Sequence, residues 1–203
     1  MASLDDATHQ IVFTITKPGE MRELWGGAVT VRLPGGYIDS SDCRPLPDNQ
    51  EVFVHMTTDQ SFIFELLEPV DAADYGALGK AHLMSVLDDN EADDPQHFRV
   101  LEVAQLTPAH LPSLGTSEFM ACHVRAEMLV SKFKEQARNH VQLSLIAIRL
   151  KNHATDLVIS YHHPAQLNPD SSSADSAAPD AGWADTLIPV VKSLAIRDWH
   201  LFG

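Results

Sequence analysis

The sequence predicts an α+β fold in which an antiparallel sheet is covered by helices. Several stretches alternate apolar and polar residues with the period of two that is typical of half-buried strands. One helix-like stretch separates two groups of these strands, and another lies near the C-terminus. Because strands and helices do not alternate regularly along the chain, the α+β class is favoured over a parallel sheet.

The first expected strands lie in the N-terminal third of the chain. Residues 28–33 alternate apolar and polar side chains and are followed by a Pro-Gly-Gly turn, which predicts a half-buried strand. The β-rich runs 51–55 and 61–68 are separated by a short polar segment. We therefore expect them to pair as a hairpin.

Two stretches are expected to be helices. The stretch 71–89 has Asp71 as a candidate N-cap and a period close to that of a helix, although its two glycines weaken the prediction. The stretch 183–196 predicts a C-terminal helix, in which Pro189 marks a kink or a first-turn boundary. The residues expected on one face of the first helix are Tyr75, Leu78, His82 and Val86.

The remaining expected strands lie between these helices. Residues 97–106 suggest a strand that ends at Thr107-Pro108, and the runs 141–150 and 155–163 are expected to form a hairpin. The clearest alternation covers residues 119–130. One face of this run carries Met120, Cys122, Val124, Ala126, Met128 and Val130, and the other carries His123, Arg125 and Glu127.

The domain organisation follows from the segments that lack such patterns. Residues 1–22 are interpreted as an N-terminal extension with a possible short strand at 11–16. A single domain is expected over residues 23–203. Within it, residues 164–182 are rich in Pro, Ser, Ala and Asp and predict a disordered loop, because they offer too little apolar surface to bury.

The composition is that of a soluble acidic protein. The 203 residues include 14 Lys and Arg against 28 Asp and Glu, a formal net charge of −14. This charge repels phosphate backbones and anionic lipids, so nucleic acids and acidic membranes are poor partners. It favours encounter with a basic protein surface or serves solubility alone. The sequence also has no apolar run long enough to insert into a membrane.

The cysteines and the N-terminus bear on the cellular compartment. Cys43 and Cys122 are far apart and have no spacing typical of a zinc or redox motif, which fits a reducing compartment. The N-terminal residues lack the pattern of a secretory signal, and the pair Asp5-Asp6 argues against a transit peptide. The nucleus or the cytosol is therefore expected.

The usual enzyme motifs are not found in the sequence. There is no G-x-S-x-G, P-loop or G-x-G-x-x-G motif, and the paired glycines fit turns. His153, His162 and His163 could in principle gather a metal, but neighbouring strand residues point to opposite faces. No cofactor and no metal are therefore expected.

Asp48 and Glu51 raise the question of a catalytic carboxylate pair. Glycosidase-like catalysis needs two carboxylates across a cleft, one of them with a pKa raised by burial. Two acids beside one turn should instead be solvated and ionised. A structural interpretation, in which Asp48 caps a turn and Glu51 is a surface strand residue, also accounts for them.

Residues 24–68 contain the long segment "LWGGAVTVRLPGGYIDSSDCRPLPDNQEVFVH", followed by "DQSFIFELLE". This segment resembles the Mog-type Ran guanine nucleotide release factors. A looser match continues through "TDLVISYHHP" and the ending "SLAIRDWHLFG". The chain departs from the family pattern at Trp25, where Tyr or Phe is usual, and at Cys43, where Leu is common.

The resemblance implies a fold, a partner and a site. The family fold is an antiparallel sheet of about six strands flanked by helices, similar to the photosystem subunit PsbP. The P-D-x-Q-E motif of the family engages the small GTPase Ran, which implies contacts from Asp48, Asn49, Gln50 and Glu51, with both acids presented on one exposed edge. A role in nuclear protein import, in nucleus and cytoplasm, is implied as well.

The expected mechanism is exchange by competition, without covalent chemistry. A carboxylate near the nucleotide would attract the P-loop lysine of Ran or disfavour its magnesium ion, or would stabilise an opened Ran conformation. A non-exchanging acidic adaptor for Ran or another basic protein, and an enzyme with a pocket on the sheet, are the alternatives. A monomer is expected.

Further residues are expected at the site, namely Asp39, Asp42 and Glu68. Arg44 is expected either to contact Ran or to form an ion pair with Asp42 or Asp48.

Overall fold

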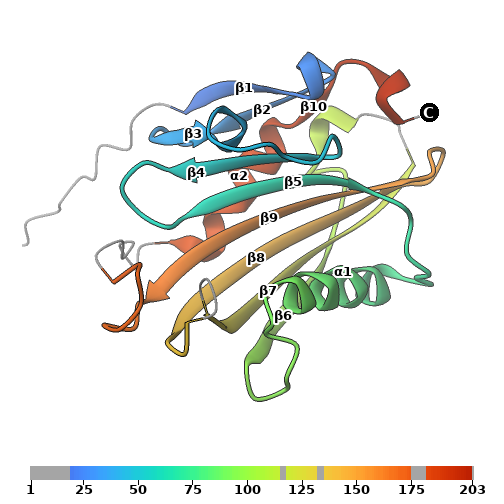
Figure 1. The fold of residues 1–203 in the computed structure, drawn as a ribbon. Coiled ribbons are helices and arrows are strands. Elements are labelled where there is room, and N and C mark those ends of the chain that lie inside the picture. The colour runs from blue at the N-terminus through green and yellow to red at the C-terminus, as the bar shows by residue number, and fades with distance from the viewer. Residues whose placement is uncertain (1–18, 115–117, 132–134, 175–181, 203) are drawn as a thin grey trace, which may run out of the picture.

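The predicted α+β class is confirmed, with a sheet larger than expected. The computed structural model describes residues 19–114, 118–131, 135–174 and 182–202. A seven-stranded antiparallel sheet forms the body of the protein, and a three-stranded sheet lies beside it (Figure 1). The resemblance implied about six strands in one sheet. The strand predicted at 28–33 belongs instead to the separate small sheet, and β3, which forms one edge of the large sheet, was not predicted.

Strands that are neighbours in the large sheet are all antiparallel. In spatial order they are β3 (Tyr37–Asp39), β4 (Gln50–His55), β5 (Ser61–Leu67), β9 (Thr155–Gln166), β8 (Arg138–Leu150), β7 (Phe119–Ser131) and β6 (Phe98–Leu106). The small sheet is formed by β1 (Glu20–Leu24), β2 (Val29–Leu33) and β10 (Ala195–Ile196). The two predicted hairpins, β4–β5 and β8–β9, are both present.

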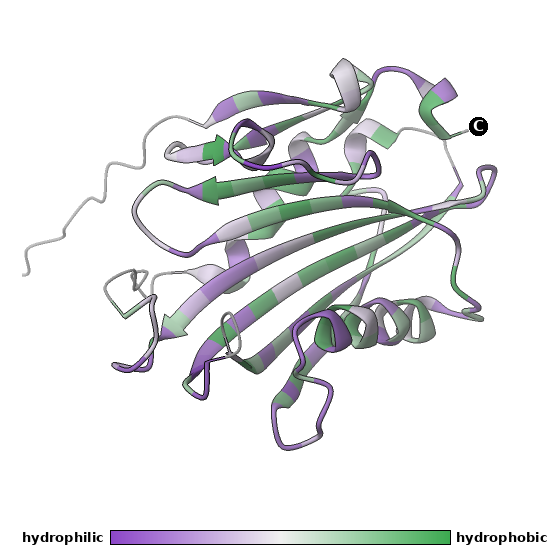
Figure 2. Cartoon of the chain, viewed as in Figure 1, coloured by the Kyte–Doolittle hydropathy of each residue, from purple (hydrophilic) through white to green (hydrophobic). Residues whose placement is uncertain are grey.

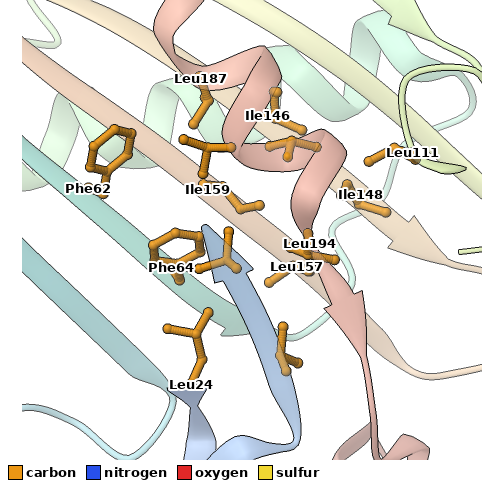
Figure 3. Close-up of a cluster of buried hydrophobic side chains, with 14 of the residues drawn as sticks. Leu24, Phe62, Phe64, Leu111, Ile146, Ile148, Leu157, Ile159, Leu187 and Leu194 are labelled. Atoms are coloured by element: carbon orange, nitrogen blue, oxygen red, sulfur yellow. The ribbon is translucent and has the colours of Figure 1, made fainter. Parts of the chain in front are cut away.

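Each face of the large sheet has its own hydrophobic core. Helix α2 (Trp183–Ser193) and the small sheet cover one face, and helix α1 (Tyr75–Asp89) covers part of the other (Figure 1). In Figure 3, side chains of the sheet such as Phe64 and Ile159 gather with Leu187 of α2. Figure 2 shows the hydrophobic positions along the middle of β8, which lies between both cores.

Strand β7 confirms the alternation predicted for it. Cys122, Val124, Ala126 and Met128 are buried in the core beneath α1. The opposite face of β7 is covered too, since His123 is buried and its Nε2 lies 2.7 Å from Oγ of Ser144. Cys122 is therefore a small apolar core residue, as expected.

Helix α1 begins later than predicted. Its N-cap is Asp74, whose carboxylate accepts a hydrogen bond from the amide of Ala77 at 2.8 Å, and the prediction of Asp71 as N-cap is wrong. The reason lies in two strands that are distant in sequence, β8 and β9. Asp156 accepts from the amide of Val70, and Arg149 donates to the carbonyl oxygen of Val70, so the segment before the helix is tied to the sheet.

The C-terminal helix ends earlier than predicted. Helix α2 stops at Ser193, and Ala195 and Ile196 pair with β2 as β10 instead of continuing the helix. Pro189 lies inside the helix and does not mark its first turn. The backbone amides of Arg197 and Asp198 donate to the carbonyl oxygen of Ala28 at 2.7 and 3.1 Å, so the end of the chain is joined to the start of β2.

The segments expected to lack structure are partly ordered. Residues 20–22, assigned to the extension, pair with β2, while the possible strand at 11–16 lies outside the described residues. The prediction of a disordered loop over 164–182 is wrong for its first part. Residues 164–166 belong to β9, and the side chain of Asn139 bonds Ser171 and the amide of Asn168. Polar contacts, and not burial of apolar side chains, order this first part. Residues 175–181 lie outside the described residues.

Candidate functional site

The "PDNQ" turn is fixed to the neighbouring strand by its backbone. The amide of Gln50 donates to the carbonyl oxygen of Pro47 at 3.0 Å, which closes the turn. Asn49 then continues the pairing of β4 with β5. Its carbonyl oxygen accepts from the amide of Leu66 at 2.9 Å, and its Nδ2 donates to the carbonyl oxygen of Leu66 at 3.1 Å. Asp48 is thereby held on the surface, exposed to solvent.

Gln50 and Glu51 point to opposite faces of β4, as successive strand residues must. Nε2 of Gln50 donates to Oε1 of Glu65 at 3.0 Å, across the pair that β4 forms with β5. Glu51 shares its face with Phe53, which is buried beneath the small sheet. The face that carries Glu51 therefore packs against this core.

Glu51 is half-buried and contacts the turn that joins β1 and β2 of the small sheet. Its Oε1 accepts a hydrogen bond from the amide of Trp25 at 2.6 Å. Burial raises the pKa of Glu51; the Trp25 bond opposes this shift and nearby Asp39 adds to it. The expectation that both acids of the motif stand on an exposed edge is thus wrong for Glu51, although it holds for Asp48.

Trp25, which donates this hydrogen bond, has an unfavourable backbone conformation. Trp25 has φ +49°, in the left-handed region that bulky residues rarely adopt. This conformation costs roughly 1–2 kcal/mol, whereas a hydrogen bond to a charged acceptor contributes about 1.5–3 kcal/mol. The Glu51 carboxylate is therefore strong enough to hold Trp25 in this conformation.

The other predicted site residues lie around the same end of β4. Asp39 caps the short 3-10 turn Ser40–Asp42 by accepting from the amide of Ser41 at 2.8 Å, and Asp42 is exposed. Arg44 is also exposed and, within the described residues, forms an ion pair with neither Asp42 nor Asp48. The alternative in which Arg44 neutralises the turn is therefore not realised.

Glu68 completes a concentration of carboxylates. It is exposed and follows the last residue of β5, at the end of the hairpin where β4 begins. The segment leading into β4 is hydrophilic (Figure 2). The acidic end, as we name this region, comprises Asp39, Asp42, Asp48, Glu51, Glu65 and Glu68, with Arg44 among them.

Two residues, one in the acidic end and one bonded to it, were not predicted as site residues from the sequence. Glu65 faces Gln50 only because of the β4–β5 register, which strand alternation alone does not fix. Trp25 is separated from Glu51 by 26 positions. The signal that could have found Trp25 is the pair Gly26-Gly27 after it, since both glycines have positive φ and indicate a left-handed turn.

His162 and His163 point to opposite faces of β9, as predicted for neighbouring strand residues. Nε2 of His162 lies 3.1 Å from Oγ of Ser160, whereas Nδ1 of His163 lies 3.0 Å from Nε2 of Gln60, so the two rings diverge. Among the described residues, no three His, Cys, Asp or Glu side chains are placed to hold a metal ion. No helix in the described part of the chain has the length and apolar character to cross a membrane.

A groove between α2 and strands β6 and β7 is the place where an enzyme site would be sought. It has a volume of about 360 Å³ and is lined in part by His123, Arg125 and Asp185. Burial, with a contribution from Arg125, lowers the pKa of His123 to about 4. The partner of His123 is Ser144, which is fully buried and cannot present its hydroxyl to a substrate in the groove. The pair therefore stabilises the strands.

Comparison with known proteins identifies the family. Residues 22–164 match the model of the family described as Ran-interacting Mog1 protein. The chain belongs to the Mog1 family. This Mog1-family chain is 34% identical over 183 residues to the Ran guanine nucleotide release factor of Danio rerio, covering 90% of the chain and 99% of the relative. It is 32% identical over 182 residues to the protein of the same name from Homo sapiens, covering 89% and 95%.

Solved structures agree with this assignment at the level of the fold. The crystal structure of the Saccharomyces cerevisiae Ran-binding protein Mog1p superposes with a TM-score of 0.68 at 24% identity, covering 91% of this Mog1-family chain and 98% of that chain. The solution structure of cyanobacterial PsbP (CyanoP) from Synechocystis has a TM-score of 0.51 at 12% identity, covering 88% and 92%. The predicted similarity to the PsbP fold is therefore confirmed.

Proposed function

We propose that this protein binds the small GTPase Ran and promotes release of its guanine nucleotide, in support of nuclear protein import. The observation that carries the proposal is the alignment of relatives named Ran guanine nucleotide release factor with about nine-tenths of the chain and nearly their own full length. A further relative is named nuclear import protein mog1, from Schizosaccharomyces pombe. The protein works by binding, as a monomer in nucleus and cytoplasm.

The acidic end is the proposed Ran-binding region. Asp42, Asp48 and Glu68 are exposed and can approach a basic surface directly. The formal net charge of −14 supports rapid encounter with such a surface. Asp39, Asn49, Gln50 and Glu51 shape this end, and Arg44 can reach a carboxylate of the partner.

The proposed mechanism acts on the phosphate site of Ran. GTPases of this class hold the nucleotide with a P-loop lysine and a magnesium ion. A carboxylate from the acidic end lowers nucleotide affinity by attracting that lysine or disfavouring the metal, or the acidic end stabilises a Ran conformation whose nucleotide site is open. Neither route makes or breaks a covalent bond in the protein.

The test is release of a fluorescent guanine nucleotide from purified Ran. We expect the wild type to accelerate release and the Asp48→Ala/Glu51→Ala variant to lose most of this effect. The matched control is Asp88→Ala/Asp89→Ala, which removes the same charge from exposed positions at the end of α1. Equal loss in both variants would mean that overall charge matters and the acidic end does not.

Two other results would change the proposal. Binding of Ran without faster release would select the adaptor function, in which the protein engages Ran but does not exchange its nucleotide. If the wild type neither binds Ran nor accelerates release, the proposed function is wrong.

A further inference from the structure

The loop Trp25–Gly27, between β1 and β2, has an unusual run of left-handed backbone. Its three residues have φ values of +49°, +65° and +91°. Gly26 is exposed, and a Cβ placed on it would meet no atom within 4 Å. An exposed glycine backbone of this kind lets a partner approach closely. We call this segment the WGG loop.

The WGG loop is held at both of its ends by distant parts of the chain. At its start, Oε1 of Glu51 accepts from the amide of Trp25 at 2.6 Å. After its end, the carbonyl oxygen of Ala28 accepts from the amides of Arg197 and Asp198. Within the described residues, Nε1 of Trp25 is buried without a hydrogen-bond partner, so the indole itself does not anchor the loop through that atom.

Glu51 differs from the exposed acids of the acidic end in its burial and in its hydrogen bonding. Its carboxylate is half-buried and one oxygen is engaged by Trp25, whereas Asp48, three residues earlier, is exposed. A charge that is engaged inside the molecule is poorly placed to bind a partner's cation. It is well placed to fix the loop that lies over it.

We propose that the WGG loop is a contact surface for Ran, and that Glu51 is a positioning residue that holds the loop rather than touching Ran. This inference rests on the proposed function. In this proposal the two acids of the P-D-x-Q-E motif have different roles. Asp48 supplies exposed charge to the partner, and Glu51 fixes the shape of a neighbouring backbone surface.

The first test compares conservative and severe changes at each acid. Glu51→Gln keeps an oxygen that can accept from Trp25, whereas Glu51→Ala does not. In binding to purified Ran, measured with GDP-loaded and with GTP-loaded Ran, we expect Glu51→Gln to stay within about 3-fold of the wild-type Kd and Glu51→Ala to weaken binding about 10-fold. At Asp48 the charge itself matters, so Asp48→Asn and Asp48→Ala should weaken binding equally.

The second test changes the loop without changing any charge. Gly26→Gln adds a side chain in open space at φ +65°. The matched control is Gly182→Gln, at φ +73° and equally open, at the other end of α2 from β10. Both substitutions carry the same backbone strain. We expect only Gly26→Gln to weaken Ran binding, by about 10-fold.

A spectroscopic readout reports the loop in the absence of Ran. In NMR spectra of the free protein, the amide proton of Trp25 should be shifted downfield and protected from exchange in the wild type and in Glu51→Gln. Both properties should be lost in Glu51→Ala. An amide that is unchanged in Glu51→Ala would show that Glu51 does not hold the loop.

The outcomes separate this inference from the function on which it rests. If the wild type binds Ran but Glu51→Gln is as weak as Glu51→Ala, the positioning role is overturned and the proposed function stands. The same applies if Gly26→Gln binds Ran as well as Gly182→Gln does, which would remove the loop from the contact. If the wild type does not bind Ran, both proposals fall together.

Discussion

The buried carboxylate of Asp156 should contribute strongly to stability. It accepts hydrogen bonds from Nε2 of His82 at 2.9 Å, from Nε and Nη2 of Arg149 at 2.8 Å each, and from the amide of Val70 at 3.2 Å. These contacts join α1, the segment before it and strands β8 and β9. The perturbation we consider is Asp156→Asn, which keeps the volume and removes the charge.

The size of the effect follows from two independent arguments. Removing one partner of a buried ion pair costs about 3–5 kcal/mol, and the slight exposure of Arg149 places this case near 3 kcal/mol. Burial by itself would raise the pKa of Asp156, but the bonds from His82, Arg149 and Val70 lower it to about 2 from 3.8. That difference corresponds to about 2–3 kcal/mol in the free energy of unfolding.

The pH dependence has a defined sign. Because the folded-state pKa of Asp156 lies below the unfolded-state value, this contribution is fully present above about pH 4. It is lost as the pH falls from there through about 2. Asp156→Asn should therefore be destabilised at pH 7 and should lose this part of the acid dependence.

Urea unfolding at pH 7 and at steps between pH 4 and 2 measures both quantities. The control is Asp170→Asn, because Asp170 is exposed and its carboxylate has no hydrogen bond in the described structure. An Asp156→Asn variant that loses less than about 1 kcal/mol at pH 7, or that keeps the wild-type acid dependence, would refute this reasoning.

Three further predictions concern the helix and a buried histidine. Asp74→Ala should lower the free energy of unfolding by about 1 kcal/mol, because the N-cap is lost. Asp71→Ala should change it by less than about 0.5 kcal/mol. Thermal unfolding of both variants measures the difference. Gly79→Ala should cost about 1–3 kcal/mol, because its Cβ would lie 2.7 Å from Cγ2 of Val124; urea unfolding without destabilisation would contradict the packing. The pKa of His123 is lowered to about 4 from 6.5, so the free energy of unfolding should fall by up to about 3 kcal/mol as the pH drops across this interval. In urea titrations, His123→Gln should show a weaker dependence on pH.

Local patterns predicted the elements well and their ends less well. Alternation alone placed Cys122 in the core, because β7 pairs along its full length and every side chain keeps its face. The start of α1 could not be fixed in the same way. The sequence "DAAD" offers two aspartates as caps, and the choice between them depends on Arg149 and Asp156, which are remote in sequence.

The same limit applies to the acidic end. The motif and the resemblance located Asp48 and Glu51, but they did not distinguish the exposed acid from the engaged one. That difference arises because the small sheet covers the face of β4 that carries Glu51 and Phe53. A hint was present in the alternation, since Glu51 is two residues from a large aromatic side chain and so shares its face.

The pairing of β10 with β2 sets the order in which the molecule can be completed during synthesis. Strands β1 and β2 are made early, yet the carbonyl oxygen of Ala28 accepts its hydrogen bonds from the amides of Arg197 and Asp198, far along the chain. The fold around the WGG loop therefore closes only after residues 195–198 have been made. A nascent chain that stops before these residues lacks this closure, so its proposed binding surface is not yet assembled.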